Sequence, residues 1–139
     1  QTVVLTGGVR TPSDSLVGPT AQSALRAVHL DAVFMGVHGM SQRFGLSTPN
    51  LMEVETNRAF LAATDNLVVV ADHSKWNQNG FSVIAPLSAA RTLVTDDGYP
   101  DGVRQVLTEH VDEVVFVPVV QDATTEVPSA HPRSEESTE

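Results

Sequence analysis

The sequence has no cysteine among its 139 residues, which excludes a disulfide scaffold, a thiolate metal site and thiol redox chemistry. It is also poor in bases: eight stand against 17 acids, for a net charge of −9, and Lys75 is the one lysine beside seven arginines. A field of that sign repels a polyanion, so we expect these residues by themselves to bind DNA poorly. No apolar run approaches the ~20 residues that a membrane helix needs, and no signal peptide is visible.

What is present indicates one globular domain followed by a tail. Apolar residues make up 41% of the chain and charged residues 18%, a composition that can bury a core, and we predict a folded domain over residues 1–120. From residue 121 the composition shifts to Pro, Ser, Thr and Glu, which predicts a flexible acidic tail over residues 121–139. Because the chain begins with Gln1 and enters a strand-like segment at once, we interpret it as a piece of a longer cytoplasmic protein.

Short β-branched runs alternate with helical patterns along the predicted domain. The expected strands are 2–6, 31–36, 66–71, 81–85, 92–95 and 113–120, and the expected helices are 19–28, 50–64 and 101–110, with one turn at 86–90. This alternation, with continuously apolar strands, predicts an α/β fold in which a mostly parallel sheet carries helices on both faces. Pro118 places the end of the last strand at a sheet edge. Ligands bind beyond the carboxyl ends of such strands, at loops 7–18, 36–49 and 72–80.

The loops contain none of the common phosphate or hydrolase motifs. There is no G-x-x-x-x-G-K-[ST], no G-x-G-x-x-G after a strand and no G-x-S-x-G. His38 and His73 both follow strands and could meet around a metal ion. Isolated loop histidines are usually solvated or hydrogen-bonded, however, so we predict no metal site and no cofactor.

Glycines at two predicted strand ends are candidates for contact with a ligand. Gly7 and Gly8 follow the first strand, and Gly36 and Gly39 follow the second. Glycine in such a place permits close approach of the backbone to a ligand, although it also serves ordinary turns. His38, in the second of these loops, is a further hydrogen-bond donor.

Polar residues after the third strand form another candidate group. Asp72, Ser74 and Lys75 follow the most apolar strand of the chain. An ammonium group pairs with phosphate and a carboxylate accepts hydrogen bonds from sugar hydroxyls, so this loop suits a phosphorylated or polyhydroxylated small molecule. The same residues would also form an ordinary polar turn.

Two glutamates lie in the first turns of the helix expected at 50–64. Acids there complement the helix dipole, which is sufficient reason for both Glu53 and Glu55. Glu55 binds a ligand if it points into the cleft; otherwise it forms a surface pair with Arg58, three residues further on.

Several short motifs in a fixed order resemble a known family. They are LTGG after a strand, SLVGP, DAVFMG, a loop ending FGL, the helix EVETNRAFLAA and VVVADHSKW. Over residues 3–96 the chain thus resembles the effector domain of DeoR-type bacterial transcriptional repressors. The resemblance implies a domain that binds a phosphorylated sugar or related metabolite, an N-terminal helix-turn-helix that binds DNA, and assembly as dimers or tetramers. It also implies a fold similar to that of ribose-5-phosphate isomerase.

The chain departs from the family pattern in ways that bear on function. It lacks the DNA-binding segment and the first strand of the effector domain with its Asp-Ser-Gly-Thr-Thr loop, which corresponds to a phosphate cradle in the isomerases. By the resemblance, Glu55 falls where the isomerases place their catalytic base, and residues 72–75 match their Asp-x-Ser-Lys stretch. Their carboxylate loop has become residues 35–39, without an acid, and their Lys-Gly-Gly loop has no lysine counterpart. An enzyme without these groups cannot readily transfer protons or stabilise an enediolate.

We therefore predict a ligand-sensing module without catalytic activity, located in the bacterial cytoplasm. The expected binding residues are Gly7, Gly8, Gly36, His38, Gly39, Glu55, Asp72, Ser74 and Lys75. Two alternatives remain open: a sugar-phosphate isomerase or deaminase that uses Glu55 as its base, and a receiver-like phosphoacceptor domain. The expected partners are a phosphorylated sugar effector and further copies of the chain, with DNA bound only through the absent N-terminal domain and no membrane contact.

Overall fold

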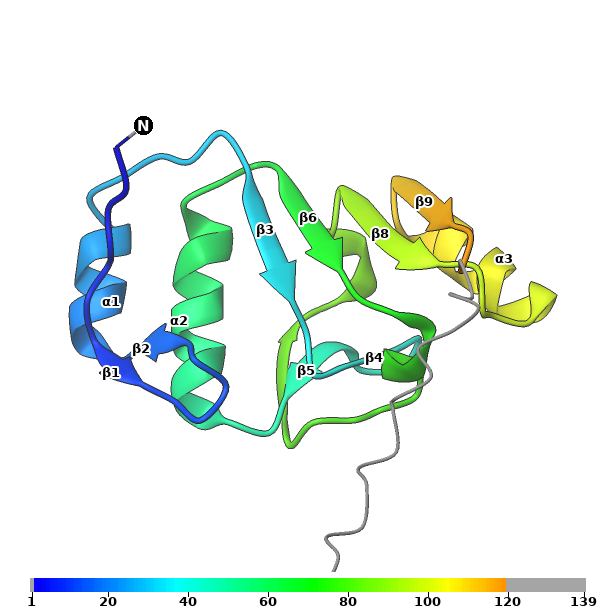
Figure 1. Cartoon of the computed structure of the whole chain (residues 1–139), viewed down its shortest axis with the longest axis horizontal. Helices are drawn as coiled ribbons and strands as arrows, with labels where there is room; N and C mark the ends of the chain where they lie inside the picture. The colour runs from blue at the N-terminus through cyan, green and yellow to red at the C-terminus, as the bar shows by residue number, and fades with distance from the viewer. Residues whose placement is uncertain (1, 120–139) are drawn as a thin grey trace, which may run out of the picture.

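The computed structural model describes residues 2–119, and it contains three α-helices in that range (Figure 1). The helices are α1 (Pro19–Leu25), α2 (Leu51–Ala62) and α3 (Asp101–His110), and two short 3-10 turns are η1 (His73–Lys75) and η2 (Leu87–Ala89). The strands are β1 (Val9–Arg10), β2 (Leu16–Val17), β3 (Val33–Gly36), β4 (Gly39–Ser41), β5 (Gly45–Thr48), β6 (Leu67–Val70), β7 (Ser82–Ala85), β8 (Thr92–Asp96) and β9 (Glu113–Val117). No helix in this range is long and apolar enough to cross a membrane.

The centre of the fold is a parallel sheet of four strands in the order β3-β6-β8-β9. Met35 of β3 is aligned with Val69 of β6, and Val69 with Leu93 of β8, so apolar side chains form rows across one face. The arrows of these strands run in one direction in Figure 1. The predicted α/β class is confirmed, and β9 lies at a sheet edge as Pro118 indicated.

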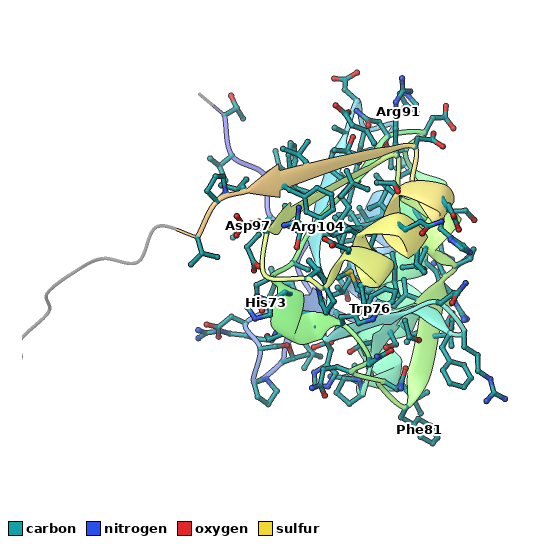
Figure 2. The ribbon with its side chains drawn as sticks, turned by 90° about the vertical axis from the view of Figure 1, so that its right-hand side faces the viewer. His73, Trp76, Phe81, Arg91, Asp97 and Arg104 are labelled. Carbon is teal, nitrogen blue, oxygen red and sulfur yellow. The ribbon has the colours of Figure 1, made fainter. Side chains whose placement is uncertain are left out.

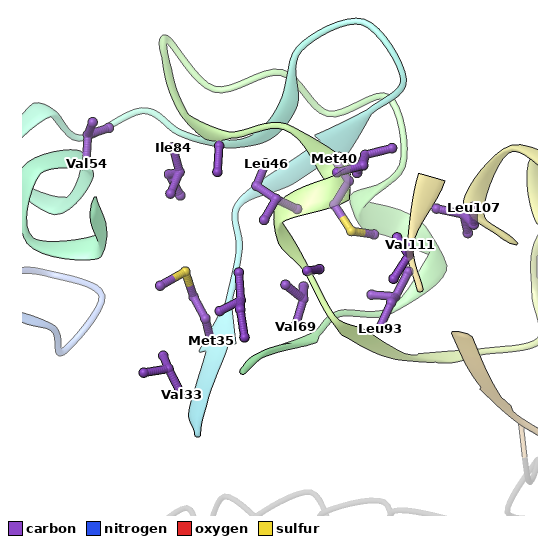
Figure 3. Close-up of a cluster of buried hydrophobic side chains, with 14 of the residues drawn as sticks. Val33, Met35, Met40, Leu46, Val54, Val69, Ile84, Leu93, Leu107 and Val111 are labelled. Carbon is purple, nitrogen blue, oxygen red and sulfur yellow. The ribbon is translucent and has the colours of Figure 1, made fainter. Parts of the chain in front are cut away.

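One face of the parallel sheet carries the hydrophobic core (Figure 3). A three-stranded antiparallel sheet in the order β4-β5-β7 covers this face, together with side chains of α2 and α3. Met40, Leu46, Val69, Leu93 and Leu107 are at most 1% exposed. Full burial of one such side chain contributes about 1.5–3 kcal/mol, so this cluster accounts for much of the stability of the fold.

The opposite face of the parallel sheet is open in this part of the chain. The exposed fractions are 75% for Phe34, 48% for Val70, 39% for Val115 and 48% for Val117. Parallel sheets are ordinarily covered on both faces. The sequence led us to expect helices on both faces of this sheet, and the open face differs from that expectation. Within residues 2–119, the outer edge of β3 is likewise without a strand partner.

Three segments differ from the sequence-based expectation. The expected loop at 7–18 contains the short strands β1 and β2, which pair antiparallel. Residues 2–6 form no strand, and Val3, Val4 and Leu5 are 83%, 83% and 77% exposed, because none of the described strands runs beside them. The expected loop at 37–49 instead contains β4 and β5, which pair as an antiparallel hairpin. Gly45 allows the hairpin to pack against β7, since a Cβ there would lie 2.2 Å from the carbonyl oxygen of Ala85. The predicted acidic tail, 121–139, lies outside the described residues.

Candidate functional site

A cleft of about 580 Å³ opens at the carboxyl end of β3, between the β1–β2 hairpin loop and the start of α2. Hydroxyl and amide groups dominate its polar lining, with one carboxylate. The lining residues are Pro12, Ser13, Ser15, Gly36, Val37, His38, Thr48, Pro49, Asn50, Glu53 and Asn57. The position agrees with the rule that ligands bind beyond the carboxyl ends of parallel strands.

Glu53 is the acid in this cleft, and both oxygens of its carboxylate accept a hydrogen bond from a hydroxyl group. The Ser13 hydroxyl donates to Oε1 at 2.5 Å, and the Thr48 hydroxyl donates to Oε2 at 2.7 Å. Partial burial raises the pKa of Glu53, but these hydrogen bonds outweigh it, so the pKa lies below its usual value of 4.5. Glu53 also lies in the first turn of α2, where the helix dipole stabilises a negative charge.

Local structure fixes the two hydroxyl donors. Thr48 is the last residue of β5 and only 2% exposed, and its hydroxyl also accepts a hydrogen bond from the main-chain N–H of Asn50, the residue that caps α2. Ser13 lies in the β1–β2 loop, where its hydroxyl is 2.8 Å from that of Thr11. The Thr11 hydroxyl in turn accepts a hydrogen bond from the main-chain N–H of Ser15 at 3.2 Å, which closes the loop. One donor is therefore part of the core, and the other stands on an exposed loop.

Glu55, which the sequence favoured as the ligand-binding acid, does not line the cleft. Its Oε1 is 3.1 Å from the Arg58 guanidinium, with both side chains more than half exposed. Residues two apart in a helix point in different directions, so Glu53 and Glu55 could not both face the cleft. One signal favoured Glu53: it follows the helix cap Asn50 by three residues, the spacing at which an acid supports the start of a helix.

Two further predicted residues do line the cleft. Gly36 is the last residue of β3, and a Cβ built on it would meet no atom within 4 Å. Its missing side chain therefore leaves space in the cleft. His38 is exposed at the same end of the strand and lines the cleft.

The other predicted glycines serve packing and turns. A Cβ on Gly8 would lie 2.4 Å from the carbonyl oxygen of Val17, across the β1–β2 hairpin. A Cβ on Gly39 would lie 2.0 Å from the carbonyl oxygen of Gln78. Gly7 has a φ of +71°, a conformation that glycine adopts readily. None of these three glycines lines the cleft.

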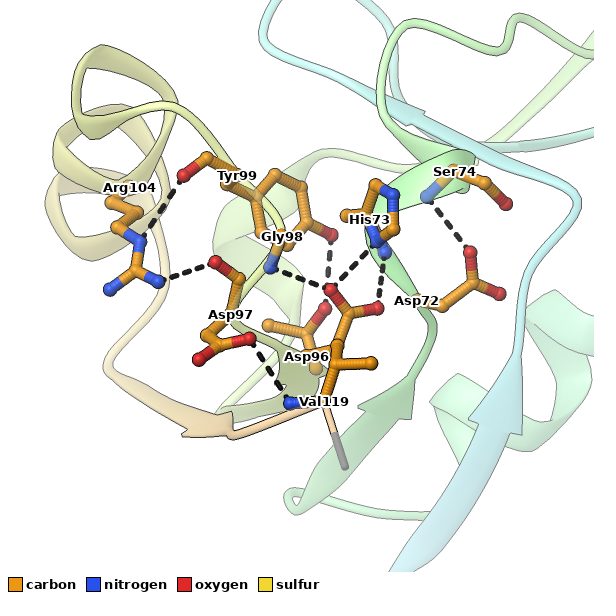
Figure 4. Close-up of polar contacts among 10 residues, drawn as sticks. Asp72, His73, Ser74, Asp96, Asp97, Gly98, Tyr99, Arg104 and Val119 are labelled. Carbon is orange, nitrogen blue, oxygen red and sulfur yellow. Dashed lines mark hydrogen bonds and ion pairs between the residues drawn. The ribbon is translucent and has the colours of Figure 1, made fainter. Parts of the chain in front are cut away.

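A second polar cluster lies at the carboxyl ends of β6 and β8 (Figure 4). The Asp96 carboxylate accepts hydrogen bonds from the main-chain N–H groups of His73, at 2.9 Å, and of Gly98, at 2.8 Å. Its Oδ1 is also 2.8 Å from the ring nitrogen Nδ1 of His73. Desolvation raises the pKa of Asp96, but these hydrogen bonds outweigh it and lower the pKa. The Tyr99 ring meets His73 and Trp76 edge to face, and Figure 2 shows that His73 and Trp76 lie on the same side of the molecule.

The predicted Asp72, Ser74 and Lys75 belong to this second region and do not line the cleft. The Asp72 side chain accepts a hydrogen bond from the main-chain N–H of Ser74 at 2.8 Å and so caps η1. Hydrogen bonding from the Ser74 side chain and main chain lowers the pKa of Asp72. Ligand atoms of Asp72, His73 and Asp96 lie within 4.8 Å of one another, close enough to bind one divalent cation. The backbone hydrogen bonds that these carboxylates accept already account for their arrangement. His38 and His73 belong to different clusters.

Comparison with known proteins identifies the family. A family model described as the DeoR C terminal sensor domain matches residues 1–97. The chain is 30% identical over 116 residues to the putative aga operon transcriptional repressor of Escherichia coli O157:H7, a match that covers 83% of this chain and 43% of that protein. It is 35% identical over 95 residues to the HTH-type transcriptional regulator GlpR of Haloferax volcanii, covering 68% of this chain and 37% of the relative.

A third relative is the glycerol-3-phosphate regulon repressor of Escherichia coli K12, 28% identical over 109 residues, or 78% of this chain and 43% of that protein. The chain therefore spans less than half the length of these relatives. The family model, by contrast, covers well over half of the chain, which confirms the resemblance drawn from the motifs. The chain belongs to the DeoR family, as a C-terminal sensor domain.

Proposed function

We propose that this chain senses a phosphorylated sugar or related metabolite on behalf of a DeoR-type transcriptional repressor. Family membership supports a sensor, and the names of the relatives support transcriptional repression. The name of one of them, the glycerol-3-phosphate regulon repressor, supports a phosphorylated effector of small size. The ligand binds in the cleft at the end of β3.

The observation that carries this proposal is the chemistry of the cleft. Its lining combines serine and threonine hydroxyls, two asparagine side chains, one histidine and the carboxylate of Glu53. These groups match the alternating donors and acceptors of a sugar, and a few polar groups in a concave site are what orients a small ligand. The low pKa of Glu53 keeps its carboxylate ionised at neutral pH, ready to accept hydrogen bonds.

The same features support binding without catalysis. A general acid or base works best when its pKa lies near the working pH, which for a glutamate requires a raised pKa. The pKa of Glu53 is lowered instead. Glu55, the base of the alternative isomerase or deaminase, is turned away from the cleft and paired with Arg58. We expect no turnover of ribose 5-phosphate.

The family supports a proposal for DNA binding, assembly and location. In this proposal a helix-turn-helix outside the chain contacts the operator, the protein works as a homo-oligomer in the bacterial cytoplasm, and the effector changes operator affinity. The net charge of −9 supports the assignment of DNA contact to another part of the protein.

Thermal unfolding tests the sensor function. The chain is heated with ribose 5-phosphate, 2-deoxyribose 5-phosphate, glucose 6-phosphate, glycerol 3-phosphate or inorganic phosphate. A ligand at 100 times its Kd stabilises the folded state by about 2.7 kcal/mol, so we expect at least one sugar phosphate to raise the Tm by several degrees. The Asn57→Ala variant should lose this shift because Asn57 lines the cleft, whereas Asn79→Ala should keep it because Asn79 does not line the cleft. If no compound raises the Tm, the sensor proposal is wrong.

A further inference from the structure

We propose that Glu53 recognises a vicinal diol of the effector, and that the phosphoryl group of the effector lies away from this carboxylate. The inference rests on the proposed sensor function and specifies which part of the ligand this cleft selects. It assigns Glu53 a role in specificity.

Without a ligand, the carboxylate of Glu53 already accepts hydrogen bonds from two hydroxyl groups of the protein. The Ser13 hydroxyl donates to one oxygen at 2.5 Å, and the Thr48 hydroxyl donates to the other at 2.7 Å. Two adjacent hydroxyls of a sugar present the same pair of donors to a carboxylate, one to each oxygen or both to one. The protein thus satisfies Glu53 with the same donor chemistry that a diol provides.

The two protein donors differ in how easily a ligand can replace them. Thr48 is 2% exposed and ends a strand of the core, so its hydroxyl stays in place. Ser13 is exposed on the β1–β2 loop, and water can solvate its hydroxyl when a ligand displaces it. A sugar entering the cleft therefore takes the place of Ser13 at Oε1 and leaves the contact of Thr48 with Oε2 intact.

The negative charge of Glu53 disfavours a phosphoryl group beside it. Within residues 2–119, the cleft is lined by neither a lysine nor an arginine, and Glu53 is ionised at neutral pH. The dipole of α2, which could stabilise an anion at its N-terminus, already acts on this carboxylate. A phosphate beside Glu53 would meet a like charge without a compensating cation, whereas a neutral diol would meet an acceptor.

Isothermal titration calorimetry on the 139-residue chain tests this with four probes: ribose 5-phosphate, 2-deoxyribose 5-phosphate, ribose and inorganic phosphate. The ring of ribose 5-phosphate carries adjacent hydroxyls, and loss of its 2-hydroxyl leaves no adjacent pair. A site built to bind a hydroxyl strongly rejects an analogue that lacks it, so we expect the deoxy compound to bind at least ten-fold more weakly. Inorganic phosphate should not compete with ribose.

Three variants test which side chains determine the affinity for ribose 5-phosphate. Glu53→Gln should weaken ribose 5-phosphate binding by roughly ten-fold or more, because hydrogen bonds to a charged acceptor are the strong ones. Ser13→Ala should strengthen it several-fold, since the ligand no longer has to displace a competing hydroxyl; a merely structural role of Ser13 predicts the reverse. Glu55→Gln, two residues along the same helix, should change the affinity by less than two-fold. Ser13→Ala retains the carboxylate and so gives a result even if Glu53→Gln fails to fold.

The outcomes separate this inference from the sensor function. Equal binding of ribose 5-phosphate and its 2-deoxy analogue, competition by inorganic phosphate, or weaker binding in Ser13→Ala would each overturn diol recognition while effector sensing stands. The same holds if 2-deoxyribose 5-phosphate binds and ribose 5-phosphate does not. If no sugar phosphate binds at all, both proposals are wrong.

Discussion

The guanidinium of Arg58 donates a hydrogen bond to the main-chain oxygen of Val83 at 2.7 Å, and its Nε donates to that of Ile84 at 3.4 Å. Both acceptors belong to β7, an edge strand of the antiparallel sheet. Unpaired backbone groups on a sheet edge are available to pair with another chain, so an arginine from α2 protects this edge. It also joins the helix that carries Glu53 to the sheet beneath it.

We predict that Arg58→Ala lowers the free energy of unfolding by about 1–2 kcal/mol, because it removes hydrogen bonds from a charged donor to the edge of β7. Glu55→Gln removes only the exposed ion pair and should cost less than about 0.5 kcal/mol. Urea denaturation followed by circular dichroism measures both. Equal losses of unfolding free energy in the two variants would mean that the ion pair with Glu55, and not the contact with Val83, stabilises the fold.

The pH dependence of stability should report the hydrogen bonds of Glu53. Its pKa is lower in the folded chain than the 4.5 of a free glutamate, so its contribution is complete above pH 4.5 and is lost as the pH falls through the folded pKa. We predict that Glu53→Gln costs about 1–2 kcal/mol at pH 7 and that the difference from wild type shrinks toward pH 3. Denaturation curves at pH 7, 5 and 3 measure this. A difference that stays constant from pH 7 to pH 3 would contradict it.

Substitution by alanine should affect stability differently at Gly36, the last residue of β3, and at Gly39, the first residue of β4. Gly39→Ala would place a Cβ 2.0 Å from the main-chain oxygen of Gln78, and we expect a loss of about 2 kcal/mol or more. Gly36→Ala meets no atom within 4 Å, so its stability should change by less than about 0.5 kcal/mol, while the added methyl group narrows the cleft and weakens ligand binding. Thermal unfolding with and without ribose 5-phosphate separates the two effects. A stable Gly39→Ala protein would show that the loop carrying Gln78 can move.

The open face of the parallel sheet should bind a hydrophobic dye. We predict that the chain enhances anilinonaphthalene sulfonate fluorescence and that Phe34→Ser reduces the enhancement by about half or more without lowering the Tm, because Phe34 is 75% exposed beside other apolar side chains of that face. Phe81→Ser is the matched control: Phe81 is 81% exposed and belongs to none of the strands of the parallel sheet, and it lies at the lower end of the molecule in Figure 2. Similar reductions in the two variants would contradict a continuous apolar face.

Periodicity located the elements that depend on local sequence. The predicted helix at 101–110 has the observed bounds of α3, and the apolar run at 66–71 contains β6. Residues 2–6 have the composition of a strand and yet form none, because strand formation requires a partner that the segment itself does not contain. The hairpin at β4 and β5 was missed for the converse reason: its glycines and serines look like loop residues, and burial against β7 makes them strands.

The site was less predictable than the fold. Gly36 and His38 were found because position at a strand end is readable from sequence. The choice between Glu53 and Glu55 depends on the direction in which α2 points each side chain, and the sequence offered one signal for it, the three-residue spacing of Glu53 from the cap residue Asn50. Ser13 belongs to the cleft through a loop contact 40 residues away in sequence, which no local pattern encodes.

The cleft and the open edge of β3 are physically continuous. A groove lined by Val33, Phe34 and Met35 runs along this strand, and Ser15, Gly36 and Asn57 line the groove as well as the cleft. Any polypeptide that packed along β3 would form a new wall for the ligand, and a bound ligand would contact that polypeptide directly. Each would then change the affinity of the other by the same factor, which is the reciprocity by which a sensor passes a signal beyond its own domain.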